Sequence, residues 1–261
     1  MRWLLALVVL AVPASAQGAH RLFLAPTARP IPAGTVSLGV TNVFVPTAAV
    51  GVGSGVSVGA GVVAVPASEL AGIVFVEPKL TVWDRPGLAL ALGVTARANP
   101  FQNGAVHAVP YAVATAERGR WAGTAGVGRR VNYERRASPC QFLRDPRINC
   151  GSVGEQGRSL SVVAAPAAFG GLEVRTSERW TWVVEATAVP DQVVGYEFGT
   201  GEGRLERKPV HYDLTLGAGF RVTTGRAAVD AGLIVGQDAN GSTAPAPLVA
   251  PWLSVGVGLG R

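Results

Sequence analysis

Two of the three histidines in this sequence, His107 and His211, could serve as a general base in the body of the chain. An enzyme that hydrolyses or transfers an acyl group would need such a base within reach of a nucleophilic Ser or Thr. His211 and Asp213 fall on one face of an expected strand, but every strand places residues i and i+2 on the same face. We therefore assign no catalytic residue and predict a protein without enzymatic activity. A membrane-embedded lipid-modifying enzyme that uses one of these histidines stays an alternative.

A second set of chemically active side chains alternates with large aliphatic residues along the expected strands. A charge inside a membrane is costly unless it is paired or hydrated, so we expect this set to face the lumen of a barrel. Its members are Glu77, Lys79, Arg97, Arg130, Glu173, Glu185, Asp213, Arg221 and Asp230. Two roles remain open for them. They could line a narrow water-filled channel for small solutes, or they could form internal ion pairs that stiffen a nearly filled barrel.

The elements that position these charges are β-strands with two unlike faces. In 211–222 the residues Tyr212, Leu214, Leu216, Ala218, Phe220 and Val222 oppose His211, Asp213, Thr215, Gly217, Gly219 and Arg221. The second face has too many Gly and Ala, and too few charges, for an ordinary solvated exterior. A transmembrane barrel turns its aliphatic face to lipid and its small or polar face to the lumen, which is the pattern seen here.

The strand count and the loop lengths agree with such a barrel. Strands are expected near 35–45, 47–53, 56–65, 72–83, 88–97, 105–117, 121–131, 158–173, 180–190, 209–222, 226–235 and 248–259. That is about twelve antiparallel strands, with 10 to 14 as the range, and tight turns alternate with longer links as in bacterial barrels. Trp83, Trp121 and Trp180 all lie at tight turns, as an aromatic girdle at one membrane interface requires. Pro78, Pro110, Pro166 and Pro251 fall inside strands, where they require bulges or interrupted pairing.

The composition fits the same fold class. The chain has 261 residues, of which 48% are hydrophobic and 15% charged, with 34 glycines. An average soluble domain has about 25% charged residues and about 7% Gly. Intrinsic disorder is excluded by the amount of apolar surface, and beyond residue 16 no apolar run is long enough for a membrane-spanning helix. A soluble exported β-barrel or sandwich that binds an apolar ligand stays a further alternative.

The N-terminus predicts export. Met1 and Arg2 precede an apolar run from Trp3 to Val12, and small residues follow up to Ala16. This order is typical of a secretory signal peptide cleaved between Ala16 and Gln17. In an exported protein, Cys140 and Cys150 most simply form a disulfide that closes a local loop. The sequence shows no metal-ligand spacing, so neither a metal nor another cofactor is predicted.

The charge balance points to no nucleic-acid partner. The 23 Lys and Arg residues outnumber the 17 Asp and Glu residues, which gives a net charge of +6. The arginines are scattered, and no basic aromatic motif accompanies them. We expect outer-membrane lipid as the surrounding partner and small solutes as further partners, while the oligomeric state is not predicted.

The segment 21–30, Arg-Leu-Phe-Leu-Ala-Pro-Thr-Ala-Arg-Pro, and the following 34–46 and 50–59 resemble the start of a family of uncharacterised bacterial outer-membrane β-barrel proteins. Members open with Arg-aromatic-Phe-x-Ala-Pro-[Ser/Thr]-Ala-x-Pro, continue with a strand, and then have a turn of the Tyr-Gly-Val-Thr-Asp-Asn-Phe-Ser-Ile-Gly type. Here Leu22 and Val50 replace the usual aromatic residues, and 53–55 replaces the polar turn. The resemblance covers about 45 residues, implies an outer-membrane barrel, and implies no activity. We therefore predict a signal peptide at 1–16, a periplasmic N-terminal segment at 17–33 and a barrel at 34–261.

Overall fold

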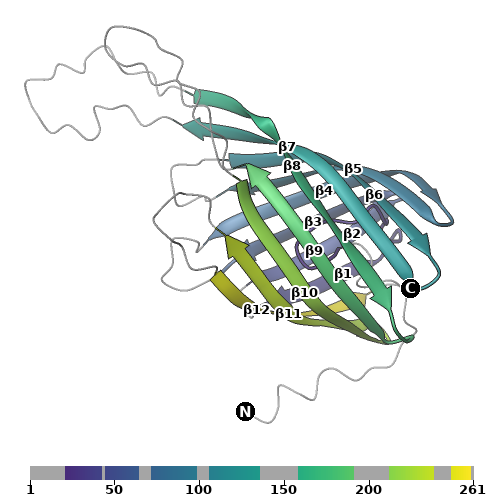
Figure 1. Ribbon diagram of the computed structural model, residues 1–261. Coiled ribbons are helices and arrows are strands. Elements are labelled where there is room, and N and C mark those ends of the chain that lie inside the picture. The colour runs from purple at the N-terminus through teal and green to yellow at the C-terminus, as the bar shows by residue number, and fades with distance from the viewer. Residues whose placement is uncertain are drawn as a thin grey trace, which may run out of the picture.

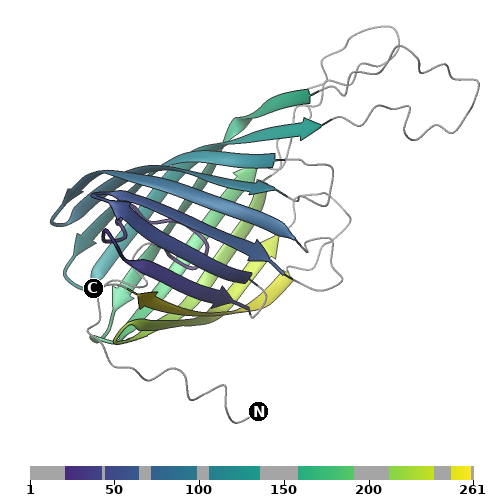
Figure 2. The same cartoon turned by 180° about the vertical axis from the view of Figure 1, so that it is seen from behind.

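The computed structural model describes residues 21–42, 45–64, 72–98, 106–135, 158–190, 212–237 and 248–259. They form twelve strands: β1 (Val36–Thr41), β2 (Val45–Gly53), β3 (Val56–Val63), β4 (Ile73–Arg85), β5 (Leu88–Ala98), β6 (Val106–Arg118), β7 (Trp121–Arg135), β8 (Arg158–Arg175), β9 (Trp180–Pro190), β10 (Tyr212–Thr224), β11 (Ala227–Gln237) and β12 (Leu248–Leu259). Each strand pairs with its sequence neighbours, and β1 pairs antiparallel with β12, so the sheet closes into a barrel (Figures 1 and 2). The predicted fold class and strand number are confirmed.

The two ends of the barrel differ. Five tight turns lie together at one end, between β2 and β3, β4 and β5, β6 and β7, β8 and β9, and β10 and β11. Four of these turns contain a glycine with positive φ, Gly55, Gly87, Gly119 and Gly225, a conformation that L residues rarely adopt. β1 also begins at this end, because Val36 pairs with Val50 of β2 and Leu259 of β12. We call this end the short-turn end and the opposite one the long-loop end.

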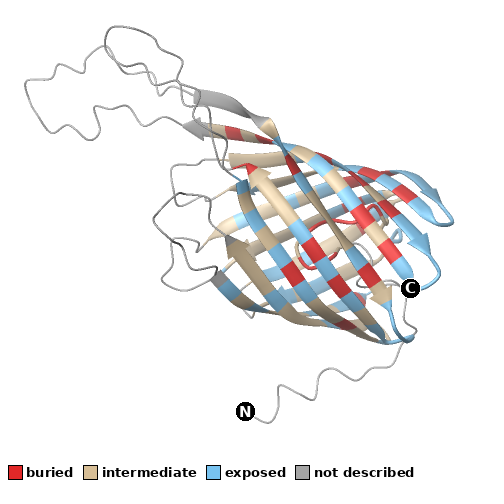
Figure 3. Cartoon of the chain, in the orientation of Figure 1, coloured by how far each residue is buried: buried red, intermediate tan, exposed pale blue. Residues whose placement is uncertain are grey.

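The strand faces are divided as the alternation predicts. Large aliphatic residues point outward and stay accessible, for example Leu216 at 58% and Leu233 at 56% exposure. Residues of the other parity point inward, and Glu185 and Arg221 are buried. Figure 3 shows this alternation as exposed and buried bands along single strands. An apolar exterior around a polar, glycine-rich interior is the arrangement of a transmembrane barrel.

Bulges and interrupted pairings explain two details of the strands. The pairing of β4 with β5 shifts between Thr81 and Trp83, so Trp83 turns outward, although strict alternation places it inside with Thr81. With Trp121 and Trp180 it forms an exposed aromatic group at the short-turn end, as predicted. A second shift lies between Arg129 and Val131, opposite the region of Pro166. The ladder there accommodates a residue that cannot donate a hydrogen bond.

The N-terminal segment departs from expectation. We predicted that residues 17–33 would lie in the periplasm, apart from the barrel. Its described part instead runs through the lumen, as the buried coil inside the barrel in Figure 3. Leu22, Phe23 and Ala28 are at most 3% exposed. The physical reason is that inward charges of the wall need partners, and the backbone and arginines of this segment supply them. We call residues 21–35 the lumen segment.

Other predictions fall on residues that the structure does not describe. These are the signal peptide at 1–16, His211, and the cysteine pair Cys140 and Cys150, whose disulfide therefore stays a prediction. The described part of the chain includes no helix long and apolar enough to cross a membrane.

Candidate functional site

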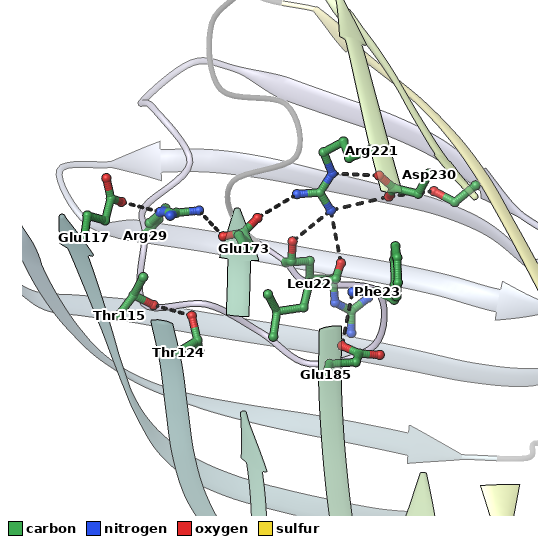
Figure 4. Close-up of polar contacts among 12 residues, drawn as sticks. Leu22, Phe23, Arg29, Thr115, Glu117, Thr124, Glu173, Glu185, Arg221 and Asp230 are labelled. Atoms are coloured by element: carbon green, nitrogen blue, oxygen red, sulfur yellow. Dashed lines mark hydrogen bonds and ion pairs between the residues drawn. The ribbon is translucent and has the colours of Figure 1, made fainter. Parts of the chain in front are cut away.

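The lumen segment begins with a tight turn that wraps around the carboxylate of Glu185 on β9. The turn is closed by a hydrogen bond from the Leu22 amide to the Ala25 carbonyl, 2.9 Å long. It directs three successive amides, those of Phe23, Leu24 and Ala25, at the two carboxylate oxygens over 3.0–3.2 Å. A carboxylate that accepts several backbone N–H groups is a strong, charge-assisted anchor. Glu185 therefore fixes the start of the segment (Figure 4).

An ion-pair network holds the start and the middle of the same segment. Arg221 on β10 binds Asp230 at 2.7 Å and Glu173 at 3.1 Å, and its Nη2 also donates to the carbonyls of Arg21 and Leu22. The second oxygen of Glu173 accepts from Arg29 of the segment at 2.7 Å. Glu173 thus joins a wall arginine to a segment arginine, as Figure 4 shows. Each of the two arginines gives a buried carboxylate a partner, which a buried charge requires.

Arg29 is charged in this network. It also donates to Glu117 near the short turn that follows β6. Burial by itself would lower the pKa of the guanidinium, but the attraction of Glu173 and Glu117 outweighs it, so that the pKa of Arg29 is raised. The guanidinium of Arg29 is therefore charged at physiological pH.

The middle of the lumen segment is held by β4 and β6. Lys79 donates to the carbonyls of Thr27 and Arg29 at 2.9 and 2.8 Å. Thr81 donates to the carbonyl of Ala28, and the hydroxyl of Thr115 accepts from the Ala28 amide at 2.9 Å. An irregular backbone that crosses a lumen has no ladder partners, and these side chains take their place.

A third ion pair anchors the segment to β4 and completes the ring of contacts. Arg21 binds Glu77 at 2.7 Å, and the other oxygen of Glu77 accepts from the Tyr111 hydroxyl at 3.2 Å. The segment is thereby attached to strands on opposite sides of the lumen, β4 and β6 on one side and β9 and β10 on the other.

Apolar contacts and glycines accommodate the segment. Leu22, Phe23 and Ala25 pack with Val183 of β9, and Ala28 packs with Ala91 and Tyr111. A Cβ on Gly171 would lie 2.6 Å from the Leu22 side chain, and one on Gly217 would lie 3.0 Å from Glu185 and 3.3 Å from Phe23. Glycines on the inner wall therefore make room for the lumen segment at these two positions.

The structure brings six of the nine predicted residues into this one site. Glu77, Lys79, Glu173, Glu185, Arg221 and Asp230 all contact the lumen segment or one of its partners. Arg130 lies apart, with its Nε on Asn132 and its Nη1 on the carbonyl of Pro190. Arg97 lines a cavity nearer the long-loop end, and Asp213 lies on the less exposed face of β10. Whether any of the nine lines a path for solutes stays a prediction.

Several contributing residues were not singled out from the sequence. The sequence identifies Arg21 and Arg29 only as part of the resembling segment, and it does not single out Glu117 or Thr115. Tyr111 is buried inside the barrel together with Val113. One sequence feature could have indicated the role of the two arginines. Arg21 and Arg29 lie in a short segment before strands that carry inward-facing Glu and Asp residues, and those acids need positively charged partners.

The free volume differs from place to place along the lumen. A cavity of about 480 Å³ lies between the turn of the lumen segment and the long-loop end, with Phe23, Phe75, Arg97, Trp252 and Asp230 among its lining. Beside the segment lies a cavity of about 70 Å³, next to Ile31, Ser57 and Lys79, and a further space of about 310 Å³ lies at the rim of the short-turn end, between Arg29, Glu117 and the turn at 84–87. A water molecule needs roughly 10–15 Å³ by this kind of measure, so the narrow part holds a few waters.

Two described side chains bear on catalytic chemistry, His107 and Ser57. His107 is hydrogen-bonded to Asn132 at 2.7 Å. Ser57 stands in a Gly-x-Ser-x-Gly stretch, 55–59. That motif activates serine on a strand-to-helix turn, whereas 55–59 runs from a hairpin turn into β3 and Ser57 is 3% exposed. Within the described residues, no three His, Cys, Asp or Glu side chains are placed to hold a metal ion.

Comparisons with known proteins add the following. No protein-family model matches the chain, and no curated protein matches it. Among solved structures, the chain is similar to the NanC porin, with a TM-score of 0.48 and 11% sequence identity over 87% of this chain and 98% of that one.

Proposed function

We propose that this protein is an outer-membrane β-barrel that forms a narrow channel for small solutes, and that its lumen segment keeps the channel closed at the short-turn end. The exposed aliphatic residues around the barrel support a lipid-facing exterior, and the resemblance of 21–59 to outer-membrane barrel proteins supports the location. Short turns face the periplasm in such proteins, so the segment would close the periplasmic side.

The observation that carries this proposal is the difference in free volume along the lumen. About 480 Å³ is available above the segment and about 70 Å³ beside it at Ile31 and Lys79, while a further space of about 310 Å³ lies below it at the rim, between Arg29 and the turn at 84–87. The two spaces share lining residues, including Ser37, Thr47 and Phe75, so they adjoin along the wall formed by β1, β2 and β4. A few waters fit at the narrow part, whereas a solute would pass only after the segment moves.

The segment is held by contacts that can be reversed. Its described anchors are hydrogen bonds, ion pairs and apolar contacts, and it joins the barrel at β1 through a short stretch that includes Gly34 (φ 75°). The part of the segment before Gly34 can leave the lumen without unfolding the strands, because the ladder between β1 and its neighbours begins at Val36 and only Gly34 and Thr35 of the described segment are bonded to Gly51 of β2.

Planar-bilayer recordings test the proposal. We expect the full mature protein to show rare or small currents, and a variant that lacks residues 17–33 to show stable, larger steps. Since the deletion exposes buried charges, Glu185→Gln serves as a second variant that keeps the whole chain, and it should open more often than the parent protein. Heat-modifiable gel migration verifies that each variant forms the barrel.

Two outcomes would contradict the proposal. Equal and stable conductance in the parent and in both variants would show that the segment does not close the lumen. An absence of current in all three folded proteins would favour the second candidate, a structural membrane component with a permanently filled barrel. The ion pairs of Arg21 with Glu77 and of Arg29 with Glu173, between segment and wall, are the observation that favours that candidate.

A further inference from the structure

The cavity between the lumen segment and the long-loop end has features of a ligand site. Its volume of about 480 Å³ lies within the range of roughly 300–1,000 Å³ that is common for small-molecule pockets. One boundary of the cavity is the turn at 21–24, and the others are inward residues of β1 to β5 and β10 to β12. The cavity is thus bounded by the segment that contacts Glu185 and Arg221.

Aromatic side chains form part of the apolar lining, beside aliphatic ones such as Val63 and Ile73. Phe23 of the segment and Trp252 of β12 pack together with ring centroids 6.2 Å apart, and Phe75 of β4 also lines the cavity. Aromatic rings offer a large contact area with specific geometry, and they are well suited to a flat apolar group. A ligand body of about the size of a phenyl ring fits this chemistry.

The polar part of the lining is rich in donors. The indole N–H of Trp252 and the Nε–H of Arg21 are buried and find no acceptor within the described part of the chain. A buried donor without an acceptor is unfavourable, so a ligand that brings oxygen atoms would be stabilised after small side-chain rotations. Arg97 adds a third donor group and is exposed.

The acid in the lining is already engaged. Asp230 is the one acidic residue among the described residues that line the cavity, and it accepts from Arg221 at 2.7 Å and from Ser254 at 3.4 Å. The other charged residues of this lining are arginines, namely Arg21, Arg97 and Arg221. The electrostatic environment therefore favours an anion over a cation.

We infer that this cavity binds a small aromatic monocarboxylate, with its carboxylate accepting from Arg97, Arg21 and the indole N–H of Trp252 and its ring against Phe23. Guanidinium groups bind carboxylates by charge-assisted, often bidentate hydrogen bonds. The binding does not depend on conduction, so it can hold whether or not the barrel forms a channel.

Titration calorimetry on the full mature protein in detergent tests this inference with 3-phenylpropanoate as the probe. We expect saturable binding of one equivalent, and at least about 10-fold weaker binding of 3-phenylpropanamide, which keeps the ring and lacks the charge. Propanoate, which lacks the ring, should also bind at least about 10-fold more weakly.

Variants locate the site. Arg97→Gln should weaken binding of 3-phenylpropanoate about 10-fold, and Trp252→Phe, which keeps a ring and removes the N–H, about 3- to 10-fold. The matched controls are Arg118→Gln at the short-turn end and Trp182→Phe on the outer face, where the side chain is 53% exposed. Both controls should bind like the parent protein.

The inference would be overturned by any of three results. These are no saturable binding of 3-phenylpropanoate, equal affinity for the amide, or cavity variants that behave like their controls. Since binding is measured without current, a silent protein in bilayers would not affect the outcome, and a failed titration would leave the proposed channel function standing.

Discussion

The two halves of the lumen differ in what their inward side chains contact, although the same strands form both. At the short-turn end, Glu173, Glu185, Arg221 and Lys79 hold the lumen segment, and the cavity beside Lys79 has about 70 Å³. Toward the long-loop end the wall carries Arg97, Thr95 and Trp252 around a cavity of about 480 Å³. The comparison teaches that inward charge alone does not identify a pore lining, since most of the charges predicted here instead hold a segment of the same chain.

The largest expected effect is at Glu173, the carboxylate shared by a wall arginine and a segment arginine. Glu173→Gln leaves Arg221 and Arg29 without their common partner in a place that is 7% exposed. Breaking a buried ion pair costs about 3–5 kcal/mol, so the free energy of unfolding should fall by about that amount in urea titrations of the detergent-folded protein. A change below about 1 kcal/mol would mean that the network is hydrated and contributes little.

The next effect concerns the anchor of the turn. Glu185→Gln removes the negative charge to which three backbone amides donate. The free energy that favours the segment inside the lumen should then fall by about 1.5–3 kcal/mol. Trypsin should then cleave after Arg21 roughly 10- to 100-fold faster, because cleavage requires the segment to leave the lumen. An unchanged cleavage rate would show that residues other than Glu185 anchor the segment.

A smaller effect is expected when a glycine of the inner face is replaced in each half of the lumen. A Cβ on Gly217 would meet Glu185 and Phe23 at 3.0–3.3 Å, whereas a Cβ on Gly236, nearer the long-loop end, would meet nothing within 4 Å. Gly217→Val should therefore lower the free energy of unfolding by about 1–3 kcal/mol, and Gly236→Val should leave it nearly unchanged. Equal effects in chemical denaturation would contradict the assignment of the filled and the open half.

The smallest effect is expected at Arg97. This side chain is exposed and lines the cavity, so Arg97→Gln should change the unfolding free energy by less than about 0.5 kcal/mol. Thermal unfolding followed by circular dichroism gives the measurement. A loss as large as that expected for Glu173→Gln would show that Arg97 is structural, like the charges of the other half.

The strands could be predicted from the sequence because each is defined by local alternation of aliphatic and small residues. β9 and β12 have the predicted bounds, and most other ends differ by a few residues. Trp83 shows the limit of this reasoning, since a bulge between Thr81 and Trp83 reverses the side on which the following residues point. A bulge depends on the partner strand, which alternation within one strand does not reveal.

The inward charges could also be predicted, but their partners could not. Glu185 contacts amides about 160 positions earlier in the chain, and Arg221 contacts carbonyls about 200 positions earlier. The lumen segment has no strand or helix periodicity, because contacts with the barrel wall determine its conformation and no regular secondary structure does. Its role therefore becomes apparent only once the barrel is closed around it.

Hydrogen exchange of the lumen segment tests the central claim most directly. In the parent protein embedded in lipid, the amides of Phe23, Leu24, Ala25 and Ala28 should exchange as slowly as those of the strands, because each donates to a buried wall side chain. Exchange within seconds, at the rate of an unstructured peptide, would show that the segment lies outside the lumen and would contradict the account.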